Sequence, residues 1–155
     1  MQNTPKLLLG NKVFDDRGSV GFVNDFDFEG VKRFYLVQNH EPGFIRAFHG
    51  HKKEGKYVTV VSGAAIIKVM SMEIWNESPV EENIHTFVLS AEKPQVLWIP
   101  PGYFNGFKTM SVDTRVMFFS TATLEESRGD DYRIEHCPNL YSKLQIKETS
   151  ICRKF

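Results

Sequence analysis

Short apolar segments separated by turn residues make up most of the chain between residues 31 and 121. These segments are rich in Val, Ile, Phe and Tyr, the residues that β-strands favour. Glycine, proline and aspartate stand between them and predict the turns. The pattern predicts eight strands: Val31–Gln38, Phe44–His51, Lys56–Ser62, Ala64–Ser71, His85–Ser90, Gln95–Ile99, Asn105–Met110 and Thr114–Thr121.

Eight consecutive short strands favour an all-β fold, a jelly-roll barrel in which two sheets pair and so protect their edges. The Glu-rich segment Leu124–Asp131 predicts a short helical turn, and Glu77–Asn83 predicts a polar loop. Beyond Tyr132 the strand pattern weakens, which predicts a short C-terminal tail that is helical or extended. No repeat or linker divides the sequence, so we expect one domain over residues 1–155.

The charge balance narrows the classes of partner. The 155 residues include 19 basic and 19 acidic side chains, and this zero formal charge predicts no nucleic-acid partner. The only apolar run near the start, Leu7–Leu9, is too short for a signal core or a membrane span. We therefore expect a cytoplasmic protein without membrane contact, in which Cys137 and Cys152 are reduced thiols.

Two histidines stand at alternate positions near the end of the predicted strand Phe44–His51. Alternate residues of a strand share a face, so this strand divides into two sets. One set contains Ile45, Ala47, His49 and His51, and the other contains Arg46 and Phe48. If the first set faces the interior, both histidines lie at the mouth of the barrel.

The residues around these histidines resemble the first signature of the cupin superfamily, in which a glycine precedes a His-x-His pair and an acidic residue follows it. His49 and His51 match the pair, but Lys56 occupies the position of the acidic metal ligand. Pro100–Asn105 resembles the second signature, Pro-x-Gly-x-x-His, with Asn105 in place of the last ligand. An ammonium group has no lone pair, and an amide oxygen is a weak ligand for a soft metal. We therefore expect no metal and no cofactor, and histidines that perform acid–base chemistry.

Further motifs are similar to those of the dTDP-4-dehydrorhamnose 3,5-epimerases, which are RmlC-like members of the cupin superfamily. Asp16-Arg17-Gly18 resembles their Asp-x-Arg-Gly, and Arg46-Ala47-Phe48-His49 resembles their Arg-Gly-Leu-His, whose histidine is the catalytic base. Lys56 matches the family lysine near the sugar oxygens. The segment from Ile99 to Phe107 resembles their Ile-Pro-x-Gly-Phe-x-His-Gly-Phe.

The chain also resembles the dTDP-sugar 3,4-ketoisomerases, whose pattern is Lys-Arg-x-Tyr followed by Arg-Gly-Phe-His-x-His-Lys. Lys32-Arg33-Phe34-Tyr35 and the segment from Arg46 to Lys52 fit that version. The epimerases also have a Tyr-Lys-x-Thr segment whose tyrosine is the general acid, whereas the matching residue here is Phe118. The sequence offers no clear counterpart to the aspartate that orients their catalytic histidine. These departures fit a ketoisomerase, a single-centre epimerase, or an enzyme whose acid is another residue such as Tyr35.

The resemblance implies a substrate and a set of roles. The substrate would be a nucleoside diphosphate 4-keto-6-deoxyhexose, linked to dTDP in the simplest case. The expected catalytic residues are His49 as base, Lys56 at the enolate oxygen, His51 as an orienting or shuttling group, and Tyr35 as acid. The expected substrate-binding residues are Arg17 and Arg46 at the diphosphate, with Gln38, Asn39 and Asn105 in the sugar pocket.

The favoured function is thus a nucleotide-sugar epimerase in deoxysugar biosynthesis for cell-surface polysaccharide. The first alternative is a dTDP-4-keto-6-deoxyglucose 3,4-ketoisomerase. A metal-binding cupin and a non-catalytic sugar-binding module are further alternatives. By analogy with the family, we expect a homodimer in which an exposed N-terminal strand is exchanged between subunits.

Overall fold

The computed structural model describes residues 3–24, 26–74 and 83–134. Within them, ten strands form two antiparallel five-stranded sheets. The first sheet has the order β1 (Lys6–Leu9), β9 (Gln95–Ile99), β6 (Lys56–Ser62), β11 (Arg115–Ser120) and β4 (Arg33–Gln38). The second has the order β12 (Tyr132–Arg133), β5 (Ile45–His51), β10 (Tyr103–Thr109), β7 (Ala64–Ser71) and β8 (Ile84–Ser90). Strands β2 (Asn11–Asp15) and β3 (Gly18–Phe22) form a separate two-stranded ribbon.

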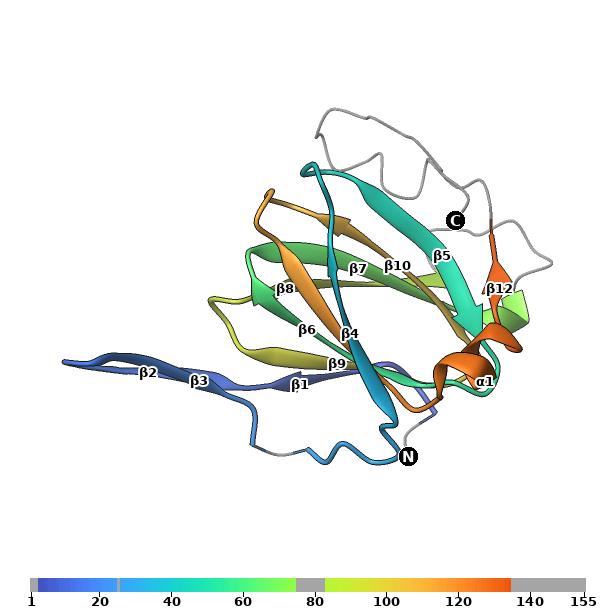
Figure 1. The fold of residues 1–155 in the computed structure, drawn as a ribbon, viewed down its shortest axis with the longest axis horizontal. Helices are drawn as coiled ribbons and strands as arrows, with labels where there is room; N and C mark the ends of the chain where they lie inside the picture. The colour runs from blue at the N-terminus through green and yellow to red at the C-terminus, as the bar shows by residue number, and fades with distance from the viewer. Residues whose placement is uncertain (1–2, 25, 75–82, 135–155) are drawn as a thin grey trace.

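The two sheets face one another and enclose the main hydrophobic core (Figure 1). The first sheet contributes Val58, Val60, Leu97, Ile99, Val116 and Phe118, and the second contributes Ala65, Ile67, Val69, Leu89 and Phe107. These residues alternate along their strands with residues of the outer faces, as a two-layer β fold requires. The arrangement confirms the predicted all-β jelly roll.

All eight predicted strands are present as β4 to β11, and their ends differ from the predicted ones by at most two residues. The helical turn is also present, as α1 (Leu124–Arg128), and a 3₁₀ turn, η1 (Met72–Ile74), follows β7. The pattern of apolar segments did not predict β1, β2, β3 or β12. The predicted C-terminal tail lies outside the described residues except for Arg133 and Ile134, as does the predicted polar loop except for Asn83. None of the helices in the described part is long and apolar enough to cross a membrane.

Strand β5 departs from simple alternation. Asn105 of β10 pairs with His49, but Phe107 pairs with Arg46, so three positions of β5 correspond to two of β10. This extra residue is a β-bulge, which reverses the side-chain faces on one side of it. The predicted division of the strand is therefore wrong for Ile45, Arg46 and Ala47, whereas Phe48 lies on the face opposite the histidines as predicted. Arg46 lines the same pocket as the histidines, while Ile45 and Ala47 pack with Phe48 in a second apolar cluster.

Two glycines of the motifs form turns that other residues would strain. Gly63 joins β6 to β7 with φ +68°, and a Cβ there would lie 2.5 Å from the Thr114 hydroxyl. Gly102 precedes β10 with φ +84°. Positive φ angles favour glycine because it lacks a Cβ. The turn at Gly63 leads the chain from the first sheet to the second, and the turn at Gly102 leads into β10, which pairs with both β5 and β7.

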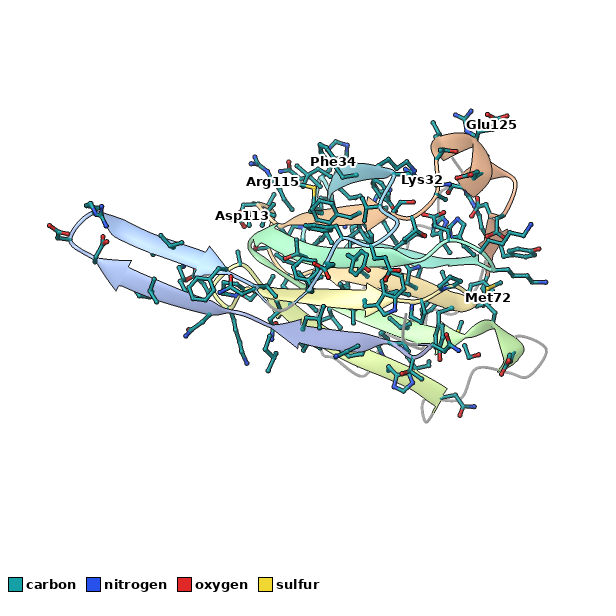
Figure 2. All side chains as sticks on the ribbon, turned by 90° about the horizontal axis from the view of Figure 1, so that it is seen from below. Lys32, Phe34, Met72, Asp113, Arg115 and Glu125 are labelled. Carbon is teal, nitrogen blue, oxygen red and sulfur yellow. The ribbon has the colours of Figure 1, made fainter. Side chains whose placement is uncertain are left out.

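The ribbon of β2 and β3 reaches far beyond the two layers (blue in Figure 1), and the perpendicular view in Figure 2 shows it clear of both sheets. Its strands carry exposed apolar side chains, among them Val13, Phe14 and Val20. Phe14 is 74% exposed. A monomer gains no burial energy from such residues, so the ribbon has the character of an interaction surface.

Candidate active site

A pocket of about 360 Å³ opens between the two sheets beside α1. Its apolar walls are Val37, Phe107, Phe118 and Leu124. Its basic groups are Arg46, Lys56, Arg128 and Arg133, and Tyr35, His49, His51, Asn105, Ser127 and Asp131 complete it. Strand residues supply most of this lining, while α1 and the segment after it close one side. The sequence folds locally in this way because Thr123 and Glu126 form a capping box that starts α1 at Leu124.

His49 is the more accessible of the two histidines, with a side chain that is 39% exposed. Its Nδ1 lies 3.8 Å from Oδ1 of Asp131, whose other oxygen accepts a hydrogen bond from Nε of Arg133 at 2.8 Å. Burial and the charge of Arg133 lower the pKa of His49, although Asp131 acts in the opposite direction. His49 is therefore a neutral imidazole near pH 7 and is able to accept a proton.

The pKa of Asp131 reflects a similar balance. Burial alone would raise it, but the hydrogen bond and charge of Arg133 outweigh burial and lower the pKa. A carboxylate thus stands beside the imidazole and stabilises the imidazolium that proton abstraction would form. The sequence analysis did not identify Asp131, because it comes from the segment after α1 and has no fixed spacing from His49.

His51 is engaged on both ring nitrogens and is almost fully buried. Nδ1 lies 3.1 Å from Nζ of Lys56, and Nε2 lies 3.3 Å from Oγ of Ser127. A carboxylate oxygen of Glu54 is 3.2 Å from the same Nε2. Burial, together with the charge of Lys56, lowers the pKa of His51 to about 4. His51 is therefore suited to hold Lys56 in place, and its ring offers no free nitrogen to a substrate.

Tyr35 and Phe118 stack in parallel, with ring centroids 5.1 Å apart and an interplanar angle of 6°. They are paired residues on the neighbouring strands β4 and β11. Burial, with a contribution from Glu54, raises the pKa of Tyr35, so its phenol remains protonated at neutral pH. The guanidinium of Arg33 lies over the tyrosine ring at 4.9 Å. A phenolic donor thus lies one strand away from the position where the epimerase motif has its tyrosine.

Arg46 reaches the pocket and is held by Asn39, whose Oδ1 accepts a hydrogen bond from its Nε at 2.8 Å. Asn39 is itself buried, and its Nδ2 donates to the Phe44 carbonyl at 3.1 Å and to the Thr109 hydroxyl at 3.2 Å. Asn39 therefore positions the arginine and does not line the pocket. Gln38 is exposed, on the opposite face of β4 from Tyr35, and also lies outside the pocket.

The remaining two predicted residues have different positions. Asn105 lines the pocket and donates from Nδ2 to the His49 carbonyl at 3.1 Å, which ties β10 to β5 at His49. Arg17 lies at the tip of the β2–β3 ribbon, where it forms an ion pair with Asp15. It does not line the pocket.

The predicted residues that meet in the pocket are thus Tyr35, Arg46, His49, His51, Lys56 and Asn105. Sequence reasoning missed Ser127, Arg128, Asp131 and Arg133 in the lining, and Glu54 behind it. The capping box marks in the sequence where α1 starts, but it does not show that α1 and the residues after it reach the pocket. Among the described residues, no cluster of three or more His, Cys, Asp or Glu side chains has the arrangement of a metal site.

Comparison with known proteins agrees with this chemistry. The family model for dTDP-4-dehydrorhamnose 3,5-epimerase matches residues 11–139. The dTDP-4-dehydrorhamnose 3,5-epimerase of Salmonella typhimurium is 31% identical over 126 residues, which are 74% of this chain and 68% of that protein.

Solved structures show the same fold in two kinds of isomerase. ChmJ, a 3'-monoepimerase from Streptomyces bikiniensis in complex with dTDP-quinovose, superposes with a TM-score of 0.77 at 16% identity over 96% of this chain and 79% of its own. A double mutant of the 3,4-ketoisomerase QdtA from Thermoanaerobacterium thermosaccharolyticum, in complex with TDP, superposes with a TM-score of 0.64 at 16% identity. The match covers 86% of this chain and 90% of the QdtA chain. Given the family match and the sequence identity, this chain belongs to the dTDP-4-dehydrorhamnose 3,5-epimerase family of isomerases.

Proposed function

We propose that the protein is a nucleotide-sugar epimerase that acts on a nucleoside diphosphate 4-keto-6-deoxyhexose in deoxysugar biosynthesis for cell-surface polysaccharide. The observation that carries the proposal is the pairing of His49 with Asp131 in a pocket that also contains the Lys56 ammonium. A ketone acidifies the neighbouring C–H bonds, so the reaction needs a neutral base and a cation near the ketone oxygen. One pocket contains both groups.

In this proposal His49 removes the proton from the carbon next to the ketone, and Asp131 stabilises the resulting imidazolium. Lys56 stabilises the negative charge that develops on the ketone oxygen. Preorganised donors of this kind are worth about 2.7–4 kcal/mol each in the transition state. Return of the proton from the opposite face of the sugar would then invert the carbon.

We assign the proton return to Tyr35. Phe118 occupies the position of the family tyrosine, and Tyr35 stacks on it from the neighbouring strand. The buried phenol keeps its proton at neutral pH, as a general acid must. The position of the acid on β4 also favours a 3,4-ketoisomerase as the second candidate function. The resemblance to that family includes the Lys-Arg-x-Tyr segment, which ends at Tyr35. Both reactions begin with the same enolisation.

The nucleotide is proposed to be dTDP, on the strength of the family. Arg46, Arg128 and Arg133 line the pocket, and their guanidinium groups suit a diphosphate because they are permanently charged and bind two oxygens at once. Asn39, expected to bind the sugar, is instead assigned to the support of Arg46, and Gln38 lies on the exposed face of β4, away from the pocket. A cytoplasmic location remains a proposal that rests on the nucleotide-sugar chemistry of the family.

A homodimer is also proposed. The exposed apolar side chains of the β2–β3 ribbon would be buried against a second copy, and Arg17 at the ribbon's tip would then lie against that copy. Sedimentation equilibrium tests this assembly, with Phe14→Ser as the variant. We expect a dimer for the natural sequence and a shift toward monomer for the variant, and a monomer for both would refute it.

Proton NMR in deuterium oxide tests the catalytic proposal, with dTDP-4-keto-6-deoxyglucose and catalytic amounts of protein. We expect deuterium to enter at C3 or C5, and the couplings of the product distinguish an inverted carbon from a shifted ketone. His49→Asn should abolish the exchange. The matched control is His85→Asn, because His85 is exposed on β8, outside the pocket. Absence of exchange with the dTDP, GDP, UDP and CDP sugars alike would refute an enzymatic function.

A further inference from the structure

We propose that Glu54 is a positioning residue for this reaction, a buried carboxylate that holds Lys56 and His51 in their working arrangement without touching the substrate. This inference rests on the proposed function, because it concerns the cation that would stabilise the enolate. Glu54 does not line the pocket. Its side chain is only 1% exposed, in the turn that joins β5 to β6.

One oxygen of Glu54 is surrounded by donors. Oε1 accepts a hydrogen bond from the Ser120 hydroxyl at 2.8 Å. The same oxygen lies 3.6 Å from Nη2 of Arg33 and 3.9 Å from Nζ of Lys56. Two cations from β4 and β6 therefore share one buried carboxylate. A buried carboxylate is costly unless it is paired, so this position is occupied by Glu54 for its charge and not for packing.

The second oxygen faces His51. Oε2 accepts no hydrogen bond from the described residues, although Nε2 of His51 is 3.2 Å away. The Lys56 ammonium has only protons to offer, so at 3.1 Å it donates to Nδ1 of His51. The proton of the neutral ring then resides on Nε2, on the side of Glu54 and Ser127. His51 thus lies between Lys56 and Glu54, and this arrangement fixes the tautomer of the histidine and the position of the lysine.

The charges around Lys56 give Glu54 its importance. Lys56 is faced by Arg33 from β4, His51 from β5, and Asp130 and Asp131 from the segment after α1. Burial lowers the pKa of Lys56, and Glu54 is the strongest of the groups that oppose this effect. Without the carboxylate, the lysine would lose its proton more readily beside the remaining guanidinium. A neutral amine would stabilise an enolate far less.

The variant Glu54→Gln tests the inference, since the amide keeps the shape and a hydrogen-bond acceptor for Ser120 but has no charge. We expect the alkaline limb of the pH–rate profile to move to lower pH. The kcat should fall at pH 8 by less than the roughly 10²–10³-fold expected for removal of an electrostatic donor itself. KM should change little. The matched control is Glu92→Gln, whose carboxylate pairs with Lys12 at 2.9 Å on the surface; its profile should equal that of the natural sequence. An unmoved alkaline limb in Glu54→Gln would overturn the inference.

A second variant and a second measurement keep the test independent of folding and of turnover. Glu54→Asp retains the charge, so its alkaline limb should stay in place while kcat falls because the shorter side chain approaches His51 less closely. A limb that moved as far as in the Gln variant would contradict the role of the charge. NMR titration of the Lys56 Cε signal needs no substrate, so it distinguishes failure of this inference from failure of the proposed function. We expect Lys56 to titrate at lower pH in Glu54→Gln, and an unchanged titration would refute the inference even if catalysis were never observed.

Discussion

Replacement of Asp131 by asparagine isolates the electrostatic support of the proposed base. The substitution keeps the size of the side chain and removes its charge, 3.8 Å from Nδ1 of His49. At this distance, Coulomb's law gives about 1 kcal/mol in water and about 4 kcal/mol at an effective dielectric constant of 20. Both groups are partly exposed, so solvent screening favours the lower part of that range. We therefore expect the plateau of kcat/KM to fall by about tenfold to a hundredfold.

The same substitution should move the pH profile in a defined direction. The carboxylate raises the pKa of His49 against burial and the charge of Arg133, so its removal lowers that pKa further. The base then stays unprotonated to lower pH, and the acid limb of kcat/KM shifts to lower pH. A base with a lower pKa is also weaker, which is why the plateau and the limb should fall together.

Deuterium exchange measured from pH 4.5 to pH 9 gives both the plateau of kcat/KM and the pH of its acid limb. The control is Asp113→Asn, which replaces a solvent-exposed carboxylate before β11 that accepts hydrogen bonds from the hydroxyls of Ser111 and Ser62. Asp113 lies at the other end of the sheets from Glu125 of α1 (Figure 2), and its variant should match the natural sequence. A plateau in Asp131→Asn within twofold of the natural protein, or an acid limb that moved to higher pH, would refute the assignment of Asp131 as the partner of the base.

Three further predictions concern the acid, the core and the buried histidine. Tyr35→Phe should lower product formation by about 10²–10⁴-fold while deuterium exchange at the substrate carbon continues. NMR measures both, through the product signals and the loss of the substrate proton signal. Equal loss of product formation and of exchange would argue against Tyr35 as the acid. Leu97→Ala should cost about 2–5 kcal/mol of unfolding free energy by urea denaturation, because Leu97 is fully buried, whereas Leu36→Ala on the exposed face should cost less than about 0.5 kcal/mol. The free energy of unfolding should fall as the pH decreases from 6.5 to about 4, because the unfolded chain protonates His51 first; His51→Gln should weaken this dependence.

The strands that build the core were predictable because each is a short apolar run between turn residues. Leu97 and Val58, for example, belong to segments whose ends are marked by proline or glycine. The strands β1 and β12 were not predictable in this way. Each lies at the edge of its sheet and has at most four residues, so its pairing depends on a neighbour that is distant in sequence. The apolar residues of the β2–β3 ribbon are exposed, so they do not form the apolar run that marks a core strand in the sequence.

The candidate site was predicted as far as local spacing reaches. His49 and His51 are two residues apart, and their meeting with Lys56 follows from the turn between β5 and β6. Arg46 reaches the pocket only because of the bulge in β5, which a period of two cannot anticipate. Asp131 is brought to His49 by pairing of β12 with β5, a contact between segments about 80 residues apart. No local pattern contains that information.

If Tyr35 is the acid, as proposed, an exchange of this role between the two adjacent strands explains how one scaffold supports more than one proton-transfer outcome. A side chain on β11 and its partner on β4 project into the same pocket from neighbouring positions, and here these are Phe118 and Tyr35. If the acid moves from one strand to the other, the enolate and its base stay in place, but the proton returns from a different direction. Because the carbon or oxygen that receives the proton determines the product, the paired β4–β11 position is where epimerisation and ketoisomerisation should separate. The reciprocal variant Tyr35→Phe with Phe118→Tyr follows from this reasoning, because it restores the acid on β11 and leaves both rings stacked.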